Sequence, residues 1–181
     1  MELLLERLQG SAASAATLLS HAELVRAAAL RDSLRRERFV LAHAFLRRSL
    51  GARLGRAPSA LVFGFGPVGK PHVDGLHFSF SRSGEFAALA LSTAQSVGVD
   101  IEEQRPINVQ LLADHHFSAA EARALVSAEK PLDDFYRLWT RKEAVLKAYG
   151  LGVSHSLACL PAARVQDFVP ATGYFGAVAL V

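Results

Sequence analysis

The segment Gly98-Val99-Asp100-Ile101-Glu102 decides the organisation of the chain, because a new strand begins here just after the polar pair Gln95-Ser96. Alternate side chains of a strand share one face, so Asp100 and Glu102 point the same way. Two carboxylates about 7 Å apart on one face repel each other unless a cation or water separates them. Mg²⁺ prefers such oxygen ligands. Taken alone, the pattern slightly favours an ordinary solvent-facing strand edge over a metal site.

Outward from this segment, predicted helices and strands alternate on both sides. A capping box at Ser20 and Glu23 opens a helical segment that we expect Gly51 to end, and Ser118 and Glu121 form a second one. The remaining predicted elements are strands over 61–63, 76–81, 86–91, 97–102 and 174–180, and a helix over 132–149 that Gly150 ends. The pattern predicts an α+β fold of two similar halves, residues 1–95 and 96–181.

The predicted helix over 132–149 carries charged residues where its apolar face should be. At about 100° per residue, Lys142 falls at the centre of that face and Glu143 at its edge. A buried lysine must extend to solvent, pair with an acid or meet an anionic ligand, because burial of an unpaired charge is costly. Lys147 lies four residues after Glu143 and could simply pair with it. The central position of Lys142 favours a functional role over a plain salt-bridge pair.

Composition limits the class of protein. The chain has 181 residues, 51% hydrophobic and 20% charged, with a net charge of +3 and one cysteine, which indicates an ordered domain without disulfides. No segment is long and apolar enough for a membrane span, and the N-terminus does not resemble a signal peptide, so we expect a cytoplasmic protein without membrane attachment. Residues 1–56 hold ten arginines against five acidic residues. This excess suggests an anionic partner, although a solvated helical face explains it equally well.

Several shorter motifs are weaker signals. Lys70-Pro71 places a lysine on a rigid turn, and Ser81-Arg82 offers a hydroxyl and an arginine in the turn between two predicted strands, as an anion site would. Arg38 ends a stripe of arginines beside the apolar face of the first long helix. We expect His115-His116 to lie on the surface, because an adjacent pair without a third ligand makes a poor metal site, and Cys159 to pack as a small core residue.

Together these motifs resemble the 4'-phosphopantetheinyl transferases, specifically the larger pseudo-dimeric class that acts on carrier proteins. The matching motifs run, from about Arg26 to the C-terminus, through Gly69-Lys70-Pro71, Phe78-Ser79-Phe80-Ser81-Arg82-Ser83-Gly84, Gly98-Val99-Asp100-Ile101-Glu102, Phe117-Ser118-x-x-Glu121 and Trp139-Thr140-Arg141-Lys142-Glu143-Ala144-x-x-Lys147. The pairing of the Gly-Val-Asp-x-Glu and Trp-x-x-Lys-Glu-Ala-x-x-Lys motifs at this separation is highly specific. Two positions of this motif depart from the family, since Arg82 stands where the family usually has histidine and Ser79 where it usually has asparagine.

The resemblance implies two α+β halves related by pseudo-twofold symmetry, with coenzyme A in the cleft between them and Mg²⁺ as cofactor. It implies that the protein transfers the phosphopantetheine arm to a serine of an apo acyl or peptidyl carrier protein. The implied metal ligands are Asp100, Glu102 and Glu143, and the implied catalytic residues are Glu143, Lys147 and Lys142. The implied coenzyme A contacts are Arg26, Arg38, Lys70, Pro71, Ser81, Arg82, Asp100 and Lys147. The N-terminal half would bind the 3'-phosphate and the C-terminal half would hold the metal.

Two other readings stay open. A relative that binds coenzyme A without transfer is suggested by Arg82, and a nucleic-acid-binding module is suggested by the arginine-rich first third. The nucleic-acid reading is weakened by the lack of interleaved aromatic residues and by the three acids, which would repel a phosphate backbone. We therefore expect a monomeric enzyme with coenzyme A and a carrier protein as partners, and no nucleic acid.

Overall fold

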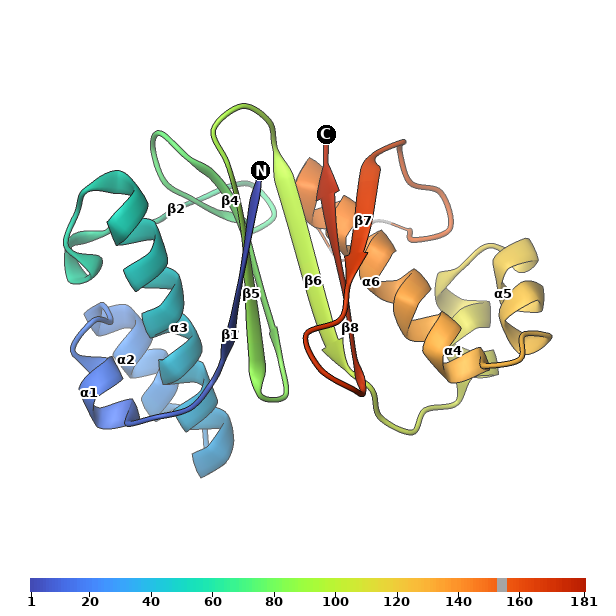
Figure 1. Cartoon of the computed structure of the whole chain (residues 1–181), viewed down its shortest axis with the longest axis horizontal. Helices are drawn as coiled ribbons and strands as arrows, with labels where there is room; N and C mark the ends of the chain where they lie inside the picture. Colours follow the sequence, from blue (N-terminus) through green and yellow to red (C-terminus); the bar gives the residue numbers. More distant parts are fainter. Residues whose placement is uncertain (153–155) are drawn as a thin grey trace.

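The computed structural model describes residues 1–152 and 156–181 and contains two main antiparallel sheets, which lie side by side (Figure 1). The first sheet has the strand order β1-β5-β4 and the second has the order β6-β8-β7. Their strands are β1 (Glu2–Arg7), β4 (His77–Ser83), β5 (Phe86–Ser92), β6 (Val97–Glu103), β7 (Arg164–Phe168) and β8 (Tyr174–Leu180). The edge strands β4 and β6 face each other where the two sheets meet.

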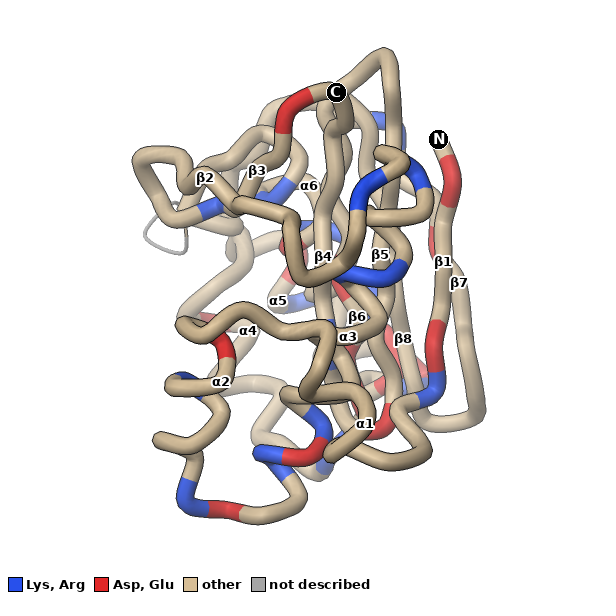
Figure 2. The backbone as a smooth tube through the Cα atoms, turned by 90° about the vertical axis from the view of Figure 1, so that its left-hand side faces the viewer, with Lys and Arg blue, Asp and Glu red and all other residues tan. Residues whose placement is uncertain are grey.

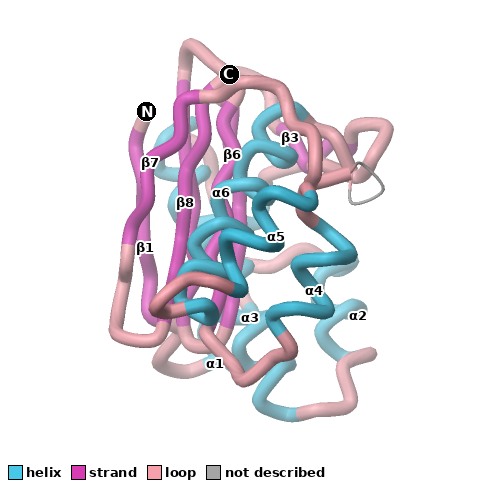
Figure 3. Tube along the Cα trace, turned by 90° about the vertical axis from the view of Figure 1, so that its right-hand side faces the viewer, coloured by secondary structure: helices cyan, strands magenta, loops and turns pink. Residues whose placement is uncertain are grey.

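Three helices accompany each sheet. The helices of the first half are α1 (Ala12–Ala16), α2 (His21–Ala28) and α3 (Ser33–Leu54), and those of the second half are α4 (Val109–His116), α5 (Ala119–Val126) and α6 (Pro131–Tyr149). Figure 3 shows α4, α5 and α6 on the same side of β7 and β8. Between α3 and β4 the chain forms a 3-10 turn, η1 (Pro58–Ala60), and a small hairpin of β2 (Gly64–Phe65) and β3 (Pro71–His72).

The two halves follow the same order of elements. Apart from the insertion of η1, β2 and β3, each half runs as one strand, three helices and two strands, and its last strand lies between its first strand and its middle one. The predicted α+β fold class is confirmed, while the pseudo-twofold relation between the halves stays a prediction. None of the helices in the described part of the chain is both long and apolar enough to cross a membrane.

The apolar periodicity of the sequence becomes the core. The alternating alanines and leucines of β5 are buried on both faces, and Phe45, Leu46 and Leu50 of α3 pack against β4 and β5. In the second half, α6 packs on β6 and β8. Removal of these side chains from water stabilises the fold by about 25 cal/mol per Å² of apolar surface. The core therefore fixes α6 against β6, which carry the two most specific motifs.

Most predicted elements are confirmed, including both capping boxes, the β4–β5 hairpin, β6, β8 and the end of α6 at Gly150. Three predictions were wrong. Gly51 does not end a helix that starts at Ser20, because Asp32 caps a separate helix, α3, which runs on to Gly55. The predicted strand at 61–63 is not formed, and the short strand β2 begins at Gly64 instead. Arg82 lies within β4 and not in the turn, which is formed at Gly84.

Candidate active site

The site begins where α6 crosses β6 at Gly98. A Cβ atom added to Gly98 would collide with the carbonyl oxygen of Ala144 and the amide nitrogen of Ala148, so only glycine allows the helix backbone to come this close. The residues that directly precede these two alanines on α6 are Glu143 and Lys147. The close approach therefore brings one turn of α6 beside Asp100, two residues further along β6.

Asp100 is the most buried charged group of the site, with 3% of its surface exposed. Its Oδ1 accepts hydrogen bonds from Lys147 Nζ at 2.5 Å and from Ser81 Oγ at 2.9 Å. Its Oδ2 is buried without a hydrogen-bond partner among the described residues. An unsatisfied oxygen of a buried carboxylate costs at least about 1–3 kcal/mol, which indicates that a further ligand completes this site.

Glu102 and Glu143 complete a concentration of negative charge. Burial raises the pKa of Glu102, the charge of Asp100 raises it further, and the Ser83 hydroxyl and the Lys147 ammonium partly offset both effects. Burial and then the charge of Asp100 also raise the pKa of Glu143, against a smaller opposite effect of Lys147. The charge of Asp100 thus disfavours the ionised form of both glutamates, and a bound cation would relieve this repulsion.

The donor set of the predicted metal site fits Mg²⁺ in chemistry. Carboxylate oxygens are its preferred protein ligands, and Asp100 Oδ2 is a buried oxygen with no other partner. Within residues 1–152 and 156–181, no three His, Cys, Asp or Glu side chains lie close enough together to hold a metal ion, so Asp100, Glu102 and Glu143 do not form a complete site in this structure. Lys147 contacts Asp100 instead, so an ammonium group supplies part of the positive charge that the acids need.

The two predicted catalytic lysines of α6 have separate environments. Lys147 reaches Asp100 and also donates to Ser81 Oγ at 3.2 Å. Lys142 pairs with Glu121 at 2.8 Å, donates to the Leu157 carbonyl at 2.6 Å and lies over the Phe117 ring. Lys142, on the apolar face of α6, is therefore paired with an acid, Glu121. The structure does not bring Lys142 to the carboxylates of β6.

Two arginines of the first half converge on Phe39. The guanidinium groups of Arg26 and Arg82 lie 5.7 Å and 5.5 Å from the centre of its ring, within cation–π distance. Burial, followed by the charge of Arg26, lowers the pKa of Arg82. Neither arginine forms an ion pair with the residues that the structure describes, whereas Arg38 lies 3.5 Å from Glu85. The pair is a local excess of positive charge that suits an anionic ligand.

Lys70 ties the loop before β3 to the second half of the molecule. Its Nζ donates to the carbonyl of Val97, at the start of β6, at 3.1 Å and to that of Ala148, near the end of α6, at 3.5 Å. Burial lowers the pKa of this lysine. Lys70 thus links two backbones across the two halves, and the next residue, Pro71, is the first of β3.

A cavity of about 740 Å³ lies between the halves. The predicted site residues in its wall are Arg26, Lys70, Pro71, Glu143 and Lys147. The other predicted residues lie outside this wall, and they are Arg38, Ser81, Arg82, Asp100, Glu102 and Lys142. Asp100 is connected to the cavity through Lys147, whose ammonium it binds.

Sequence reasoning missed a buried ionic network in this wall. Glu23 accepts a hydrogen bond from Arg47 Nε at 2.6 Å, and its Oε1 lies 3.1 Å from His43 Nδ1. Burial acts to raise the pKa of Glu23, but the hydrogen bonds from His43, Ser20 and Arg47 outweigh it and lower the pKa to about 2. The capping box marked Glu23 as part of a helix start, but no local pattern indicated partners 20 and 24 residues away.

The two other histidines and the cysteine noted in the sequence lie away from this site. His115 is exposed, as predicted, while His116 is half-buried and packs edge-on against Trp139 at 5.1 Å. Cys159 is exposed, so its prediction as a core residue was wrong. The loop after α6 leaves it at the surface.

Comparison with known proteins shows the class of protein to which this site is similar. Residues 96–175, which carry both β6 and α6, match the model of the 4'-phosphopantetheinyl transferase superfamily. This match confirms the resemblance stated from the motifs, and it covers the segment that holds all three predicted metal ligands.

Individual relatives extend the similarity into the first half. The chain is 35% identical over 148 residues to the 4'-phosphopantetheinyl transferase HetI of Nostoc, a match that covers 77% of this chain and 62% of HetI. It is 34% identical to Sfp of Bacillus subtilis over 60% of this chain and 50% of Sfp. With AcpT of Salmonella typhi it shares 44% identity over 48% of each chain. The chain thus spans about half to three fifths of the length of these curated relatives.

Proposed function

We propose that this chain transfers the 4'-phosphopantetheine arm of coenzyme A to a serine of an apo acyl or peptidyl carrier protein and releases 3',5'-ADP, with Mg²⁺ as cofactor. The observation that carries the proposal is the contact of β6 with α6, which gathers Asp100, Glu143 and Lys147 beside a cavity of about 740 Å³. The names of the relatives support the same activity.

Coenzyme A carries several phosphate charges, and the first half offers cations for them. Arg26 and Arg82 converge on Phe39 without an acidic partner among the described residues. We assign them to phosphate oxygens, because a guanidinium can donate two parallel hydrogen bonds to such a group. Arg38 is assigned to the 3'-phosphate, and this contact would replace its 3.5 Å interaction with Glu85. Lys70 and Pro71 would line the nucleotide end of the cavity.

The carboxylates of Asp100, Glu102 and Glu143 would hold the magnesium ion. When bound, Mg²⁺ would neutralise charge on the pyrophosphate oxygens and favour the displacement. The unpartnered Oδ2 of Asp100 and the raised pKa values of Glu102 and Glu143 support this assignment, because a cation would relieve both.

Side chains of this protein would accept the proton released in the reaction and stabilise the negative charge that develops. The carrier-protein serine oxygen would attack the phosphorus that bears the pantetheine arm, while the bond from that phosphorus to 3',5'-ADP breaks. Glu143 lies in the cavity wall and would accept the serine proton, directly or through a water molecule. Lys147 would stabilise negative charge on the leaving group. Lys142 is assigned a structural role, since Glu121 and Leu157 bind its ammonium.

Mass spectrometry of an apo carrier protein, incubated with this chain, coenzyme A and Mg²⁺, tests the proposal. A mass gain of one phosphopantetheine group is the expected result, and the gain should be lost when the metal is chelated. Binding of coenzyme A without any mass gain would instead show a relative that only binds this ligand.

The nucleic-acid alternative receives no support from the arrangement of charges. Seen from the side of the first half, basic and acidic positions are interspersed along the backbone (Figure 2). We also propose that the enzyme is cytoplasmic and acts as a monomer, as expected from the sequence.

A further inference from the structure

Serine side chains connect the two sheets where β4 meets β6. These strands belong to different sheets. Ser79, Ser81 and Ser83 alternate along β4 and therefore point to the same side. Their hydroxyl oxygens accept hydrogen bonds from alternate backbone amides of β6, at 3.0 Å from Val99, 3.4 Å from Ile101 and 3.0 Å from Glu103. This row of three serines, residues 79, 81 and 83, thus satisfies amides along the edge of β6.

Two serines of the row make a second contact that the third lacks among the described residues. Ser81 Oγ donates to Asp100 Oδ1 at 2.9 Å, and Ser83 Oγ donates to Glu102 Oε2 at 2.8 Å. A serine hydroxyl has one proton and two lone pairs, so it can accept from an amide and donate to a carboxylate at once. Each hydroxyl therefore fixes its carboxylate relative to the backbone of β6.

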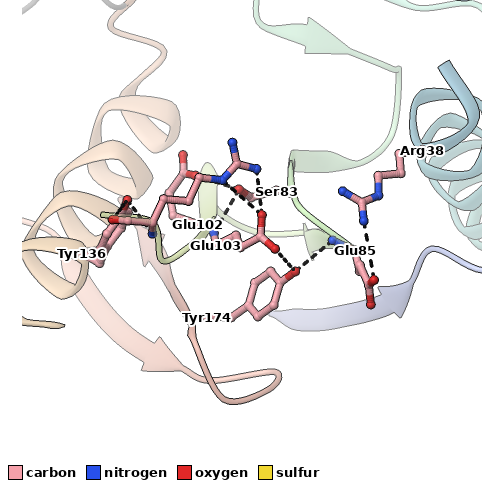
Figure 4. Close-up of polar contacts among 8 residues, drawn as sticks. Arg38, Ser83, Glu85, Glu102, Glu103, Tyr136 and Tyr174 are labelled. Carbon is pink, nitrogen blue, oxygen red and sulfur yellow. Dashed lines mark hydrogen bonds and ion pairs between the residues drawn. The ribbon is translucent and has the colours of Figure 1, made fainter. Parts of the chain in front are cut away.

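The turn that follows Ser83 is held from the second half of the molecule (Figure 4). The amide of Glu85 donates to the Tyr174 hydroxyl at 3.0 Å, and that hydroxyl donates to Glu103 at 3.1 Å. A Cβ atom on Gly84 would collide with the Tyr174 hydroxyl. Ser83 is thus held by its own hydrogen bonds to β6 and by the contact of the following turn with Tyr174.

From this geometry we infer that Ser81 and Ser83 are positioning residues, which orient the Asp100 and Glu102 carboxylates toward a divalent cation while they join the two sheets. The inference rests on the metal assignment in the proposed function. Hydrogen-bonding partners of metal ligands commonly affect metal affinity by about 10- to 100-fold. The Ser81 hydroxyl also accepts a hydrogen bond from Lys147. Among the described residues, the Ser83 hydroxyl bonds only to the amide of Glu103 and the carboxylate of Glu102. Ser83 is therefore the cleaner test.

Ser79 provides a matched control within the same row. Ser79→Ala and Ser83→Ala each remove one acceptor for a β6 amide, so both should lower the denaturation midpoint. Only Ser83→Ala removes a carboxylate contact as well. We expect Mn²⁺ titrations of the full chain, followed by the electron paramagnetic resonance of free Mn²⁺, to show about 10- to 100-fold weaker binding for Ser83→Ala. Ser79→Ala should bind Mn²⁺ like the unaltered chain, and Ser83→Thr should restore most of the affinity.

Three results would overturn the inference. Unchanged Mn²⁺ affinity in Ser83→Ala would show that its hydroxyl does not position a ligand. Equal losses in Ser79→Ala and Ser83→Ala would assign the effect to alignment of the sheets. Failure of the unaltered chain to bind Mn²⁺ would remove the metal site itself, and carrier-protein loading by the unaltered chain would then tell whether the proposed transfer fails with it.

Discussion

The two halves of the molecule carry opposite charges near one cavity, whose wall includes Arg26 from the first half and Glu143 and Lys147 from the second. In the first half, Arg26 and Arg82 lie against Phe39 without an acidic partner among the described residues. In the second half, the charge of Asp100 raises the pKa of both Glu102 and Glu143, and Lys147 pairs with Asp100. Neither arrangement favours the folded state by itself. The contrast supports the proposed ligand, which would bring phosphate groups to one side and a cation to the other.

Among the substitutions on the acidic side, loss of the Glu143 carboxylate should reduce transfer the most. We expect Glu143→Gln to reduce transfer by at least about 100-fold, as general bases typically contribute 10²–10⁴-fold. The metal-free variant should at the same time be more stable than the parent near neutral pH, because burial and Asp100 disfavour the ionised form of Glu143. Mass-spectrometric loading assays and thermal unfolding measure the two effects. Near-normal turnover would refute both its ligand and its base roles.

Acid should destabilise the first half through Glu23. Its pKa is about 2 in the folded protein against 4.5 for an ordinary glutamate, so the unfolded state binds protons first as the pH falls. The stabilisation is full above pH 4.5 and is lost between pH 4.5 and about 2, by roughly 3 kcal/mol in total. Chemical denaturation across this range should show the loss in the parent chain and a flatter profile in Glu23→Gln. Parallel profiles would place the acid sensitivity elsewhere.

Removal of Arg82 should weaken the basic side. Arg82→Ala should weaken the binding free energy of coenzyme A by about 1.5–3 kcal/mol, the value of one charge-assisted hydrogen bond. Arg82→His should restore part of the binding, and more at pH 6 than at pH 8, since an unperturbed histidine titrates near pH 6.5. Calorimetry at both pH values measures this. Binding like that of the parent chain in Arg82→Ala would show that the side chain does not meet the ligand.

Arg38 offers a test of which phosphate is bound on this side. Arg38→Ala should weaken binding of coenzyme A by about 1 kcal/mol or more and leave dephospho-coenzyme A, which lacks the 3'-phosphate, nearly unchanged. The same calorimetric titration with both ligands measures the difference. Equal losses for the two ligands would assign Arg38 to another contact, such as its pairing with Glu85.

The smallest expected effects come from substitution of the two lysines of α6, Lys142 and Lys147. Lys147→Met should lower the free energy of unfolding by about 1–2 kcal/mol, a figure reduced from that of a fully buried pair because Lys147 is 31% exposed. Lys142→Met should also destabilise, through loss of Glu121 and Leu157, but it should leave coenzyme A binding intact. Denaturation and calorimetry on both variants check this. If Lys142→Met abolished transfer with its fold intact, its structural assignment would be wrong.

Features encoded locally could be predicted from the sequence. Both capping boxes, the β4–β5 hairpin and the limits of α6 follow from residues a few positions apart, and the motif on β6 marked its carboxylates. Contacts across the halves could not be predicted, because no local pattern records them. The pairing of Lys142 with Glu121 and the serine row along β4 depend on how the elements pack. The separate start of α3 was missed because Asp32 was not recognised as a helix cap.

Calorimetric titration of coenzyme A, with Mg²⁺ and with the metal chelated, tests the central claim that one ligand bridges two oppositely charged sides. For the parent chain we predict tighter binding with Mg²⁺. Arg82→Ala should weaken binding in both conditions and keep the gain from Mg²⁺, while Glu143→Gln should keep the metal-free affinity and lose that gain. The account would be contradicted if each variant lost both the metal-free affinity and the gain from Mg²⁺ to the same extent. It would also be contradicted if Mg²⁺ did not tighten binding to the parent chain.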